Sequence, residues 1–315
     1  MKRDGVLRES GIAQQPADPT RTAAQPALRL AVSVVLPVYN EAEVIGRVVG
    51  RIAEVLANHV AEFEIIVVDD GSTDDSASEA ERAGAEVIRR PYNVGNGAAV
   101  KQGIWQASGD VILLMDGDGQ HNPEDIPRLL AEILRYDMVV AARNAESVTS
   151  RHRTLANLVY NLIASYLIGR PVADLTSGFR VFRADIAKKV AYLFPNGFSY
   201  PSTSTIALFR AGYSVKYVPV ATAARVGKSK IRLSRDGIGF LLILMRIGVL
   251  FAPMRVFLPI SLLTFAPGFI YGLYQLGIGR PWTLPVVLSV TAGLIIFALG
   301  LISEQIALLR MSRFD

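Results

Sequence analysis

The chain has 315 residues, enough for one large domain with an additional element, and its lack of cysteine excludes disulfides, thiolate metal sites and cysteine nucleophiles. Its 33 basic and 28 acidic residues give a net charge of +5, which is too small for a dedicated nucleic-acid-binding protein. Apolar residues make up 51% of the chain, yet the first two thirds have the pattern of an ordinary soluble domain. The apolar excess therefore lies near the C-terminal end and indicates a membrane segment.

The N-terminal segment, residues 1–30, mixes charged residues with Gln, Ala and Pro and has no hydrophobic periodicity. It contains no continuous apolar run of the kind that forms the core of a signal peptide. We expect a disordered tail here and not a secretion signal.

Short, β-branched apolar runs alternate with helical patterns through residues 31–236. Strands that are apolar throughout and separated by helices are typical of a parallel sheet covered on both faces. The sequence therefore predicts an α/β domain with a Rossmann-like, mostly parallel sheet and helices on both faces.

Three polar clusters follow strands of this predicted sheet. They are Tyr39-Asn40-Glu41, Asp69-Asp70-Gly71-Ser72 and Asp116-Gly117-Asp118. Open parallel sheets bind their ligands at the carboxyl ends of the strands. We therefore expect the three clusters to converge on one edge of the sheet.

The third cluster has the composition of a metal site. Asp116 and Asp118 would offer hard oxygen ligands to Mg²⁺ or Mn²⁺, and the amide oxygen of Gln120 would offer a third. An ion held there would bridge the diphosphate of a nucleotide. The same pattern also occurs in plain glycine-rich turns, and the motif alone leaves that alternative open.

Asn122 and Pro123 predict that a helix begins directly after the loop.

The C-terminal part, residues 256–315, carries the predicted membrane hairpin. Residues 256–277 and 282–303 have no charge and match the roughly 20 residues that cross a bilayer. Residues 237–255 are apolar but interrupted by Arg246, which favours a juxtamembrane, interfacial helix. The alternative for the two uncharged segments is a pair of buried core helices.

Basic residues flank the two predicted spans asymmetrically. Several precede the first span and two follow the second, whereas only Arg280 lies between them. Positive charge is enriched on the cytoplasmic side of membrane proteins. We expect an integral protein of the inner or plasma membrane, with the catalytic domain and both termini in the cytoplasm.

The polar motifs, in their order and spacing, resemble the family 2 glycosyltransferases, which have a nucleotide-sugar-binding A-type fold. The resemblance extends over about residues 32–240 and is strongest to the polyprenyl-phosphate sugar synthase group, and the two C-terminal spans are similar to those of its bacterial glucose transferases. It rests on Pro37 to Glu41, Val68 to Ser72, Asp116 to His121, Arg143, Asp174 to Arg180 and Gly227 to Lys230. It implies a metal-dependent, inverting transfer of a hexose from a UDP- or GDP-sugar to a polyprenyl phosphate, for glycan or cell-envelope assembly.

The resemblance also implies roles for individual residues. Nucleotide-sugar binding is expected from Pro37, Tyr39, Glu41, Val68, Asp70, Asp116, Gly117 and Asp118, and metal binding from Asp116, Asp118 and Gln120. The expected catalytic set is Asp118, Arg143, Arg225 and Lys230. The acceptor phosphate is expected at Arg153, Asn157 and Ser177, with Asn157 standing where the family carries Ser.

The chemistry of a phosphate acceptor supports this interpretation. A phosphate monoester is already an anion at neutral pH, so its attack on a sugar carbon needs little or no general base. We therefore expect no essential catalytic histidine. The site must instead neutralise charge on the departing diphosphate and on the attacking phosphate.

Other functions remain compatible with the sequence. A polysaccharide-extending synthase and a non-catalytic, membrane-tethered nucleotide-sugar-binding protein are the two alternatives, although the chain lacks a Gln-x-x-Arg-Trp segment. Residues 225–230 also have the pattern of a basic loop attracted to anionic lipid. Gly293 and Gly300 favour a homo-oligomer, because small residues let membrane helices approach closely.

Overall fold

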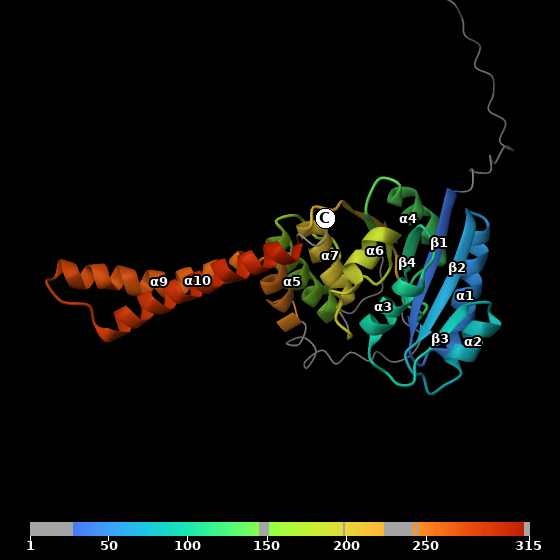
Figure 1. Ribbon diagram of the computed structural model, residues 1–315, viewed down its shortest axis with the longest axis horizontal. Helices are drawn as coiled ribbons and strands as arrows, with labels where there is room; N and C mark the ends of the chain where they lie inside the picture. The colour runs from blue at the N-terminus through green and yellow to red at the C-terminus, as the bar shows by residue number, and fades with distance from the viewer. Residues whose placement is uncertain (1–27, 145–150, 198, 224–241, 244, 312–315) are drawn as a thin grey trace, which may run out of the picture.

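Seven strands form one sheet in the computed structural model, which describes residues 28–144, 151–197, 199–223, 242–243 and 245–311 (Figure 1). The strands are β1 (Leu28–Val38), β2 (Val60–Asp69), β3 (Glu86–Arg89), β4 (Val111–Leu114), β5 (Met138–Arg143), β6 (Arg180–Arg183) and β7 (Val215–Val220). Only β6 runs antiparallel to its neighbours within this described part. The prediction of a mostly parallel sheet is confirmed.

The strand order β3-β2-β1-β4-β6-β5-β7 divides the sheet into two halves. Strands from residues 28–114 make up one half, and strands from residues 138–220 make up the other. The halves join where β4 pairs with the reversed strand β6. Each half is thus built from one continuous part of the chain.

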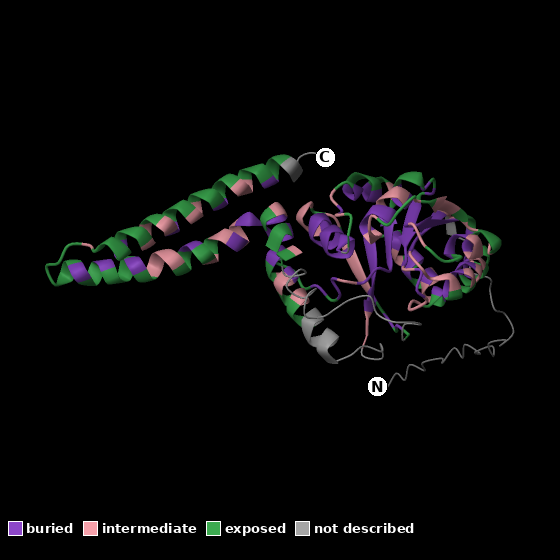
Figure 2. Ribbon diagram, turned by 90° about the horizontal axis from the view of Figure 1, so that it is seen from below, coloured by how far each residue is buried: buried purple, intermediate pink, exposed green. Residues whose placement is uncertain are grey.

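Both faces of the sheet are covered, because side chains alternate between two cores along each strand. Val34 and Leu36 of β1 lie in one core, and Val35 lies in the other. Helices α1 (Ala42–Ala57), α2 (Ser76–Arg82) and α4 (Ile126–Ile133) contribute to the first core; α3 (Asn96–Gln106), α6 (Ala184–Ala191) and α7 (Tyr200–Arg210) contribute to the second. Figure 2 shows the resulting buried centre of the domain.

The predicted helix start at Asn122 is present in the structure. The Asn122 side chain accepts a hydrogen bond of 3.2 Å from the Glu124 amide, and Pro123 occupies the first position of a short 3-10 turn, η1 (Pro123–Asp125). Helix α4 begins directly afterwards. This cap ends the Asp116–Gln120 loop and fixes its position at the end of β4.

A third core joins the α/β domain to the C-terminal helices. Its buried residues come from α5 (Arg151–Ile168), α7, a juxtamembrane helix that includes residues 245–251, and the start of α9 (Pro253–Gly277). Ile206 of α7, Phe251 and Val256 pack together in it. The membrane-directed part of the chain is therefore attached through apolar packing.

Helices α9 and α10 (Leu284–Met311) form a long hairpin that extends away from the sheet (Figure 1). Both are long and apolar enough to cross a membrane, and only 22% and 17% of their most apolar windows are buried (Figure 2). A pair of core helices would hide most of this surface, so the exposure argues against the buried-helix alternative.

Small residues bring the two helices of the hairpin into close contact. A Cβ atom added to Gly293 would lie 2.6 Å from the Cβ of Phe265, and Gly300 meets Phe257 in the same way. Ser261 Oγ donates a hydrogen bond of 2.9 Å to the Gly293 carbonyl. Gly293 and Gly300 thus face α9 within the same hairpin, so they do not support contact with a second copy. The homo-oligomer stays a prediction.

Candidate active site

The loops after β1 and β2 lie side by side at the carboxyl edge of the sheet. The strands are in register with Val38 opposite Asp69. The Asn40 amide donates to Ser72 Oγ over 2.9 Å, and the Thr73 amide donates to Asn40 Oδ1 over 2.8 Å. The two polar clusters predicted to converge are therefore joined directly by hydrogen bonds.

Asp70 holds the loop between β3 and α3 across this edge. Its carboxylate accepts hydrogen bonds from the amides of Val94, at 3.1 Å, and Gly95, at 2.7 Å, and lies 3.3 Å from Arg90 Nη1. The side chain is almost fully buried. Gly71 has a φ of +75° and no room for a Cβ atom, because the backbone of Tyr92 lies against it. The predicted contact of Asp70 with the base or ribose stays a prediction.

The loop Asp116–Gln120, here called the acidic loop, follows β4 at the same edge of the sheet. Asp118 is buried, and its carboxylate accepts a 3.1 Å hydrogen bond from the Gln120 amide. The Asp116 carboxylate lies against the backbone of Gly178, where an added Cβ atom would overlap it. Gly117 packs on Val38 with no space for a side chain. The loop is thus pressed onto the segment that precedes β6.

Arg143 and Asp174 form a partly buried, two-pronged ion pair beside the acidic loop. Arg143 Nε donates to Asp174 Oδ2 over 2.7 Å, and Nη2 donates to Oδ1 over 2.8 Å. Burial by itself would lower the pKa of Arg143, but the hydrogen bonds to Asp174 and the charges of Asp174 and Asp116 outweigh it and raise that pKa. Burial would likewise raise the pKa of Asp174, and Arg143 lowers it. Both groups therefore remain charged.

Arg180 supports the same segment from behind. Its guanidinium is fully buried and donates to the carbonyls of Ser177, at 2.6 Å, and Leu175, at 3.0 Å. It also donates to the hydroxyls of Ser204 and Thr205 on α7. The residues 174–178, here called the acceptor loop, are thus fixed between Arg143 on one side and α7 on the other.

His121 directly follows the acidic loop in the sequence, and its imidazole is neutral. Burial lowers its pKa to about 4, and its ring centroid lies 5.1 Å from that of Phe179. Nδ1 has no hydrogen-bond partner among the described residues. A neutral imidazole against the Phe179 ring is consistent with a packing role.

The donor set fits a divalent cation that also binds substrate. Within the described residues, no three His, Asp or Glu side chains cluster as a complete metal site. Mg²⁺ and ions like it are often held by one or two carboxylates together with phosphate oxygens. Asp116 and Asp118 supply two carboxylates, and Gln120 Nε2 donates to the Ala223 carbonyl over 3.4 Å, which leaves its amide oxygen for a ligand.

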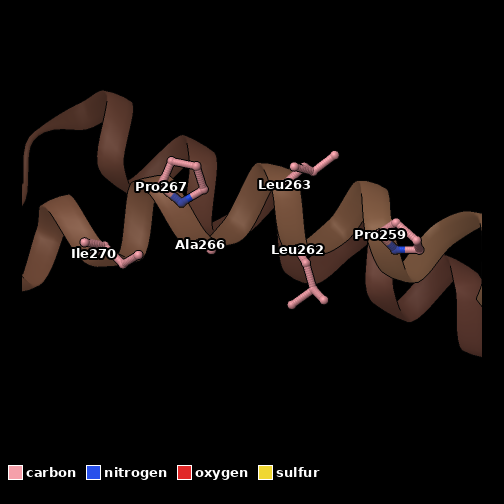
Figure 3. Close-up of a pocket in the computed structure, with 6 residues that line it drawn as sticks. All are labelled: Pro259, Leu262, Leu263, Ala266, Pro267 and Ile270. Carbon is pink, nitrogen blue, oxygen red and sulfur yellow. The ribbon is translucent and has the colours of Figure 1, made fainter.

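An apolar groove on α9 is separate from this polar site. It is lined by Pro259, Leu262, Leu263, Ala266, Pro267 and Ile270 (Figure 3). No charged or hydrogen-bonding side chain lines it, so the groove suits hydrocarbon and not group transfer.

A sequence model of the family described as Glycosyl transferase family 2 matches residues 33–191, about half of the chain and the part that holds the three polar clusters. The chain belongs to glycosyl transferase family 2. A second model, described as the GtrB C-terminal hairpin, matches residues 252–309, which cover α9 and most of α10. The family predicted from the motifs is confirmed, and so is the hairpin that follows it.

Two relatives of this family 2 chain are lipid-phosphate sugar enzymes by name. The dodecaprenyl-phosphate galacturonate synthase of Rhizobium johnstonii is 31% identical over 185 residues, 56% of this chain and 55% of that protein. The undecaprenyl-phosphate mannosyltransferase of Micrococcus luteus is 29% identical over 215 residues, 64% of this chain and 87% of that protein. The chain thus spans about half the length of the first relative and most of the second.

Solved structures share the A-type fold of family 2. The glucosyl-3-phosphoglycerate synthase of Mycobacterium tuberculosis, in complex with Mn²⁺, UDP and glucosyl-3-phosphoglycerate, has a TM-score of 0.55 and 26% identity, over 68% of this chain and 80% of that chain. The predicted fold class is confirmed by this likeness and by the sheet itself.

Several predicted site residues of this family 2 chain fall beyond the structural description. Arg225 and Lys230 lie outside the described residues, and the side chains of Arg153 and Asn157 do so as well, although both residues are helical in α5. Ala223, the last described residue before Arg225, lies beside the acidic loop, since its amide donates to the Gln120 carbonyl over 2.9 Å. Their roles stay predictions.

The sequence predicts no role for Asp174 or Arg180, although both belong to the motif at residues 174–180 that carries the family resemblance. The structure pairs Asp174 with Arg143, which lies 31 residues earlier, and buries Arg180 beneath the acceptor loop. Ser177, a predicted phosphate contact, is buried in that loop and donates its amide to Asp174 over 3.2 Å. Their place in one short, glycine-containing motif is the signal that marks the two residues, but it does not indicate their partners or their burial.

Proposed function

We propose that this family 2 chain transfers a sugar from a nucleotide-sugar to the phosphate of a polyprenyl phosphate at the cytoplasmic face of a membrane. The observation that carries the proposal is the acidic loop and the Arg143–Asp174 pair lying together at one sheet edge, in a chain with an apolar hairpin. The two relatives are named for this kind of acceptor.

An apolar surface on α5 supports a lipid acceptor. Leu158, Leu162 and Tyr166 are four residues apart, lie on one face of the helix, and are each more than half exposed. Tyr166 donates its hydroxyl to the Arg255 carbonyl over 3.0 Å, and Arg255 donates back to the Tyr166 carbonyl. The apolar face of α5 thus adjoins the start of the first span, where it would lie against the bilayer surface.

The residues of the site suit a direct displacement. Asp116, Asp118 and Gln120 would hold Mg²⁺ or Mn²⁺, which supplies charge neutralisation for a departing diphosphate. Arg143, oriented by Asp174, would present a cation toward the phosphates, and Arg225 and Lys230 would add two more. The acceptor phosphate would attack the anomeric carbon with inversion, and its own charge replaces a general base.

The donor is a UDP- or GDP-sugar in this proposal. The likeness to a synthase solved with Mn²⁺ and UDP supports testing UDP-sugars first. A bound donor stabilises the folded protein by mass action, so thermal unfolding with each nucleotide-sugar and Mn²⁺ would identify it.

The direct test uses membranes that contain the protein, a labelled nucleotide-sugar and undecaprenyl phosphate. Wild-type protein with Mn²⁺ or Mg²⁺ should give a labelled lipid, and Asp118→Ala should lower the rate at least about 100-fold, because one metal ligand is lost. Asp185→Ala is the matched control, since Asp185 is exposed and follows β6 at the opposite edge of the sheet. Full transfer by Asp118→Ala without metal would contradict the proposal.

A further inference from the structure

Four helices meet at one group of polar contacts where the α/β domain joins the membrane hairpin. Arg210, the last residue of α7, donates from Nε to the Phe251 carbonyl over 2.7 Å. Glu304 of α10 accepts a 3.2 Å hydrogen bond from the Met254 amide. The Arg210 Nη2 atom lies 3.6 Å from Glu304 Oε1. We call Arg210 and Glu304 the junction pair.

Each member of the junction pair lies at the helix end that suits its charge. The Phe251 carbonyl ends the juxtamembrane helix, where a cation is favourable, and the Met254 amide begins α9, where a carboxylate is favourable. Both side chains are largely buried, with 22% and 24% exposed. The pair therefore fixes the corner between the juxtamembrane helix and the first span.

Glu304 is the sole acidic residue in the sequence of α10. An ionised carboxylate in an apolar helix is costly unless it is paired, so its presence indicates a specific partner. Arg210 is that partner, and it belongs to the α/β domain. The second span is thus tied to the domain through one charged contact.

Helix α7 links the junction pair to the candidate active site. Its residues Ser204 and Thr205 accept hydrogen bonds of 2.9 and 2.7 Å from Arg180. Arg180 in turn donates to two carbonyls of the acceptor loop. The same helix therefore holds the acceptor loop at its centre and the membrane hairpin at its end.

We propose that Arg210 and Glu304 are positioning residues that set the height of the acceptor loop above the bilayer, so that a phosphate on a membrane-embedded chain reaches the site. This inference rests on the proposed function. It concerns the lipid acceptor alone, and donor binding does not depend on it.

The test compares two acceptors in a double-mutant cycle. Arg210→Met and Glu304→Gln should each raise the KM for undecaprenyl phosphate in membranes by roughly tenfold. The KM of the double variant should be no higher than that of either single variant, because both substitutions break the same contact. The KM for the nucleotide-sugar, and transfer to a short, water-soluble prenyl phosphate, should change by less than about twofold. Glu304→Gln keeps an oxygen for the Met254 amide and removes only the charge.

The exposed pair formed by Arg89 and Glu81 provides the matched control cycle, with a 2.9 Å contact far from the hairpin. The inference would be overturned if the two junction substitutions raised the lipid KM additively in the double variant, or if they raised the KM equally for both acceptors. If wild-type protein transferred sugar to neither acceptor, the proposed function would fail instead.

A distance measurement tests the same inference without turnover. The chain has no cysteine, so spin labels can be placed at Leu134→Cys and Leu309→Cys, both exposed positions. Glu304→Gln should broaden or shift the distance between the α/β domain and α10. An unchanged distance together with an unchanged lipid KM would refute the role of the pair, and nucleotide-sugar binding confirms that each variant is folded.

Discussion

Asp174 has more hydrogen bonds than an ordinary surface carboxylate. Besides the guanidinium of Arg143, it accepts the backbone amides of Arg143, Thr176 and Ser177 at 3.0–3.2 Å. A carboxylate with several donors stays ionised, and it fixes both the acceptor loop and the cation beside the acidic loop. We therefore predict that Asp174 affects the reaction through Arg143.

Replacing Asp174 should affect stability and transfer together. Asp174→Asn leaves the cation of Arg143 without its partner in a buried place, which we expect to cost about 2 kcal/mol in unfolding free energy and at least about tenfold in transfer rate. Thermal unfolding and the labelled-lipid assay measure the two effects. An unchanged melting temperature would show that the pair does not stabilise the fold.

The stability difference between wild type and Asp174→Asn should depend on pH. The pKa of folded Asp174 lies below its ordinary value of 3.8, so its contribution to stability is present above that value and is lost as the pH falls through the folded pKa. The difference in unfolding free energy between wild type and Asp174→Asn should be constant above about pH 5 and shrink below about pH 4.

The close packing of α9 against α10 can be tested at the glycines of the hairpin. Gly293→Ala places a methyl group 2.6 Å from the Cβ of Phe265, and we expect it to destabilise the hairpin by about 1–3 kcal/mol. Gly277→Ala is the control, because an added Cβ atom there meets nothing within 4 Å. Thermal unfolding in detergent compares them, and equal stability of the two variants would contradict the close packing.

The main elements could be predicted from the sequence because their patterns are local. Continuous apolar runs such as residues 111–114 indicated buried strands, and the Asn122 cap indicated the start of the helical segment that comprises η1 and α4. The two uncharged segments indicated the hairpin, and α9 begins at Pro253 instead of residue 256 because Pro253 opens the helix at the corner held by Glu304.

The contacts that join distant elements could not be predicted. Arg180 lies in a short strand with the sequence RVFR, which gives no sign that its guanidinium is buried. Its partners Ser204 and Thr205 lie more than twenty residues later on α7. Only the folded chain shows that this arginine supports the acceptor loop, since local patterns carry no information on such pairing.

At the scale of the whole molecule, the apolar face of α5 predicts how the domain meets the bilayer. Leu162→Glu places a charge on a residue that is 61% exposed, so the fold should tolerate it, but the contact with lipid should not. We expect roughly a tenfold rise in the KM for undecaprenyl phosphate, with little change for a soluble acceptor.

Trp105→Glu provides the control for this surface, because Trp105 is 59% exposed on α3. Kinetics in membranes of both variants would separate the two positions. A similar KM for Leu162→Glu and wild type would show that α5 does not contact the bilayer.

The division of the sheet into two continuous halves has a consequence for how such enzymes diversify. Residues 28–120 carry the loops expected to hold the nucleotide-sugar, whereas residues 138–220 carry the acceptor loop and the helix that adjoins the hairpin. The two meet only where β4 pairs with β6 among the strands described. Under the proposed function, we expect substitutions that alter the choice of sugar and substitutions that alter the choice of lipid to fall in separate stretches of the gene.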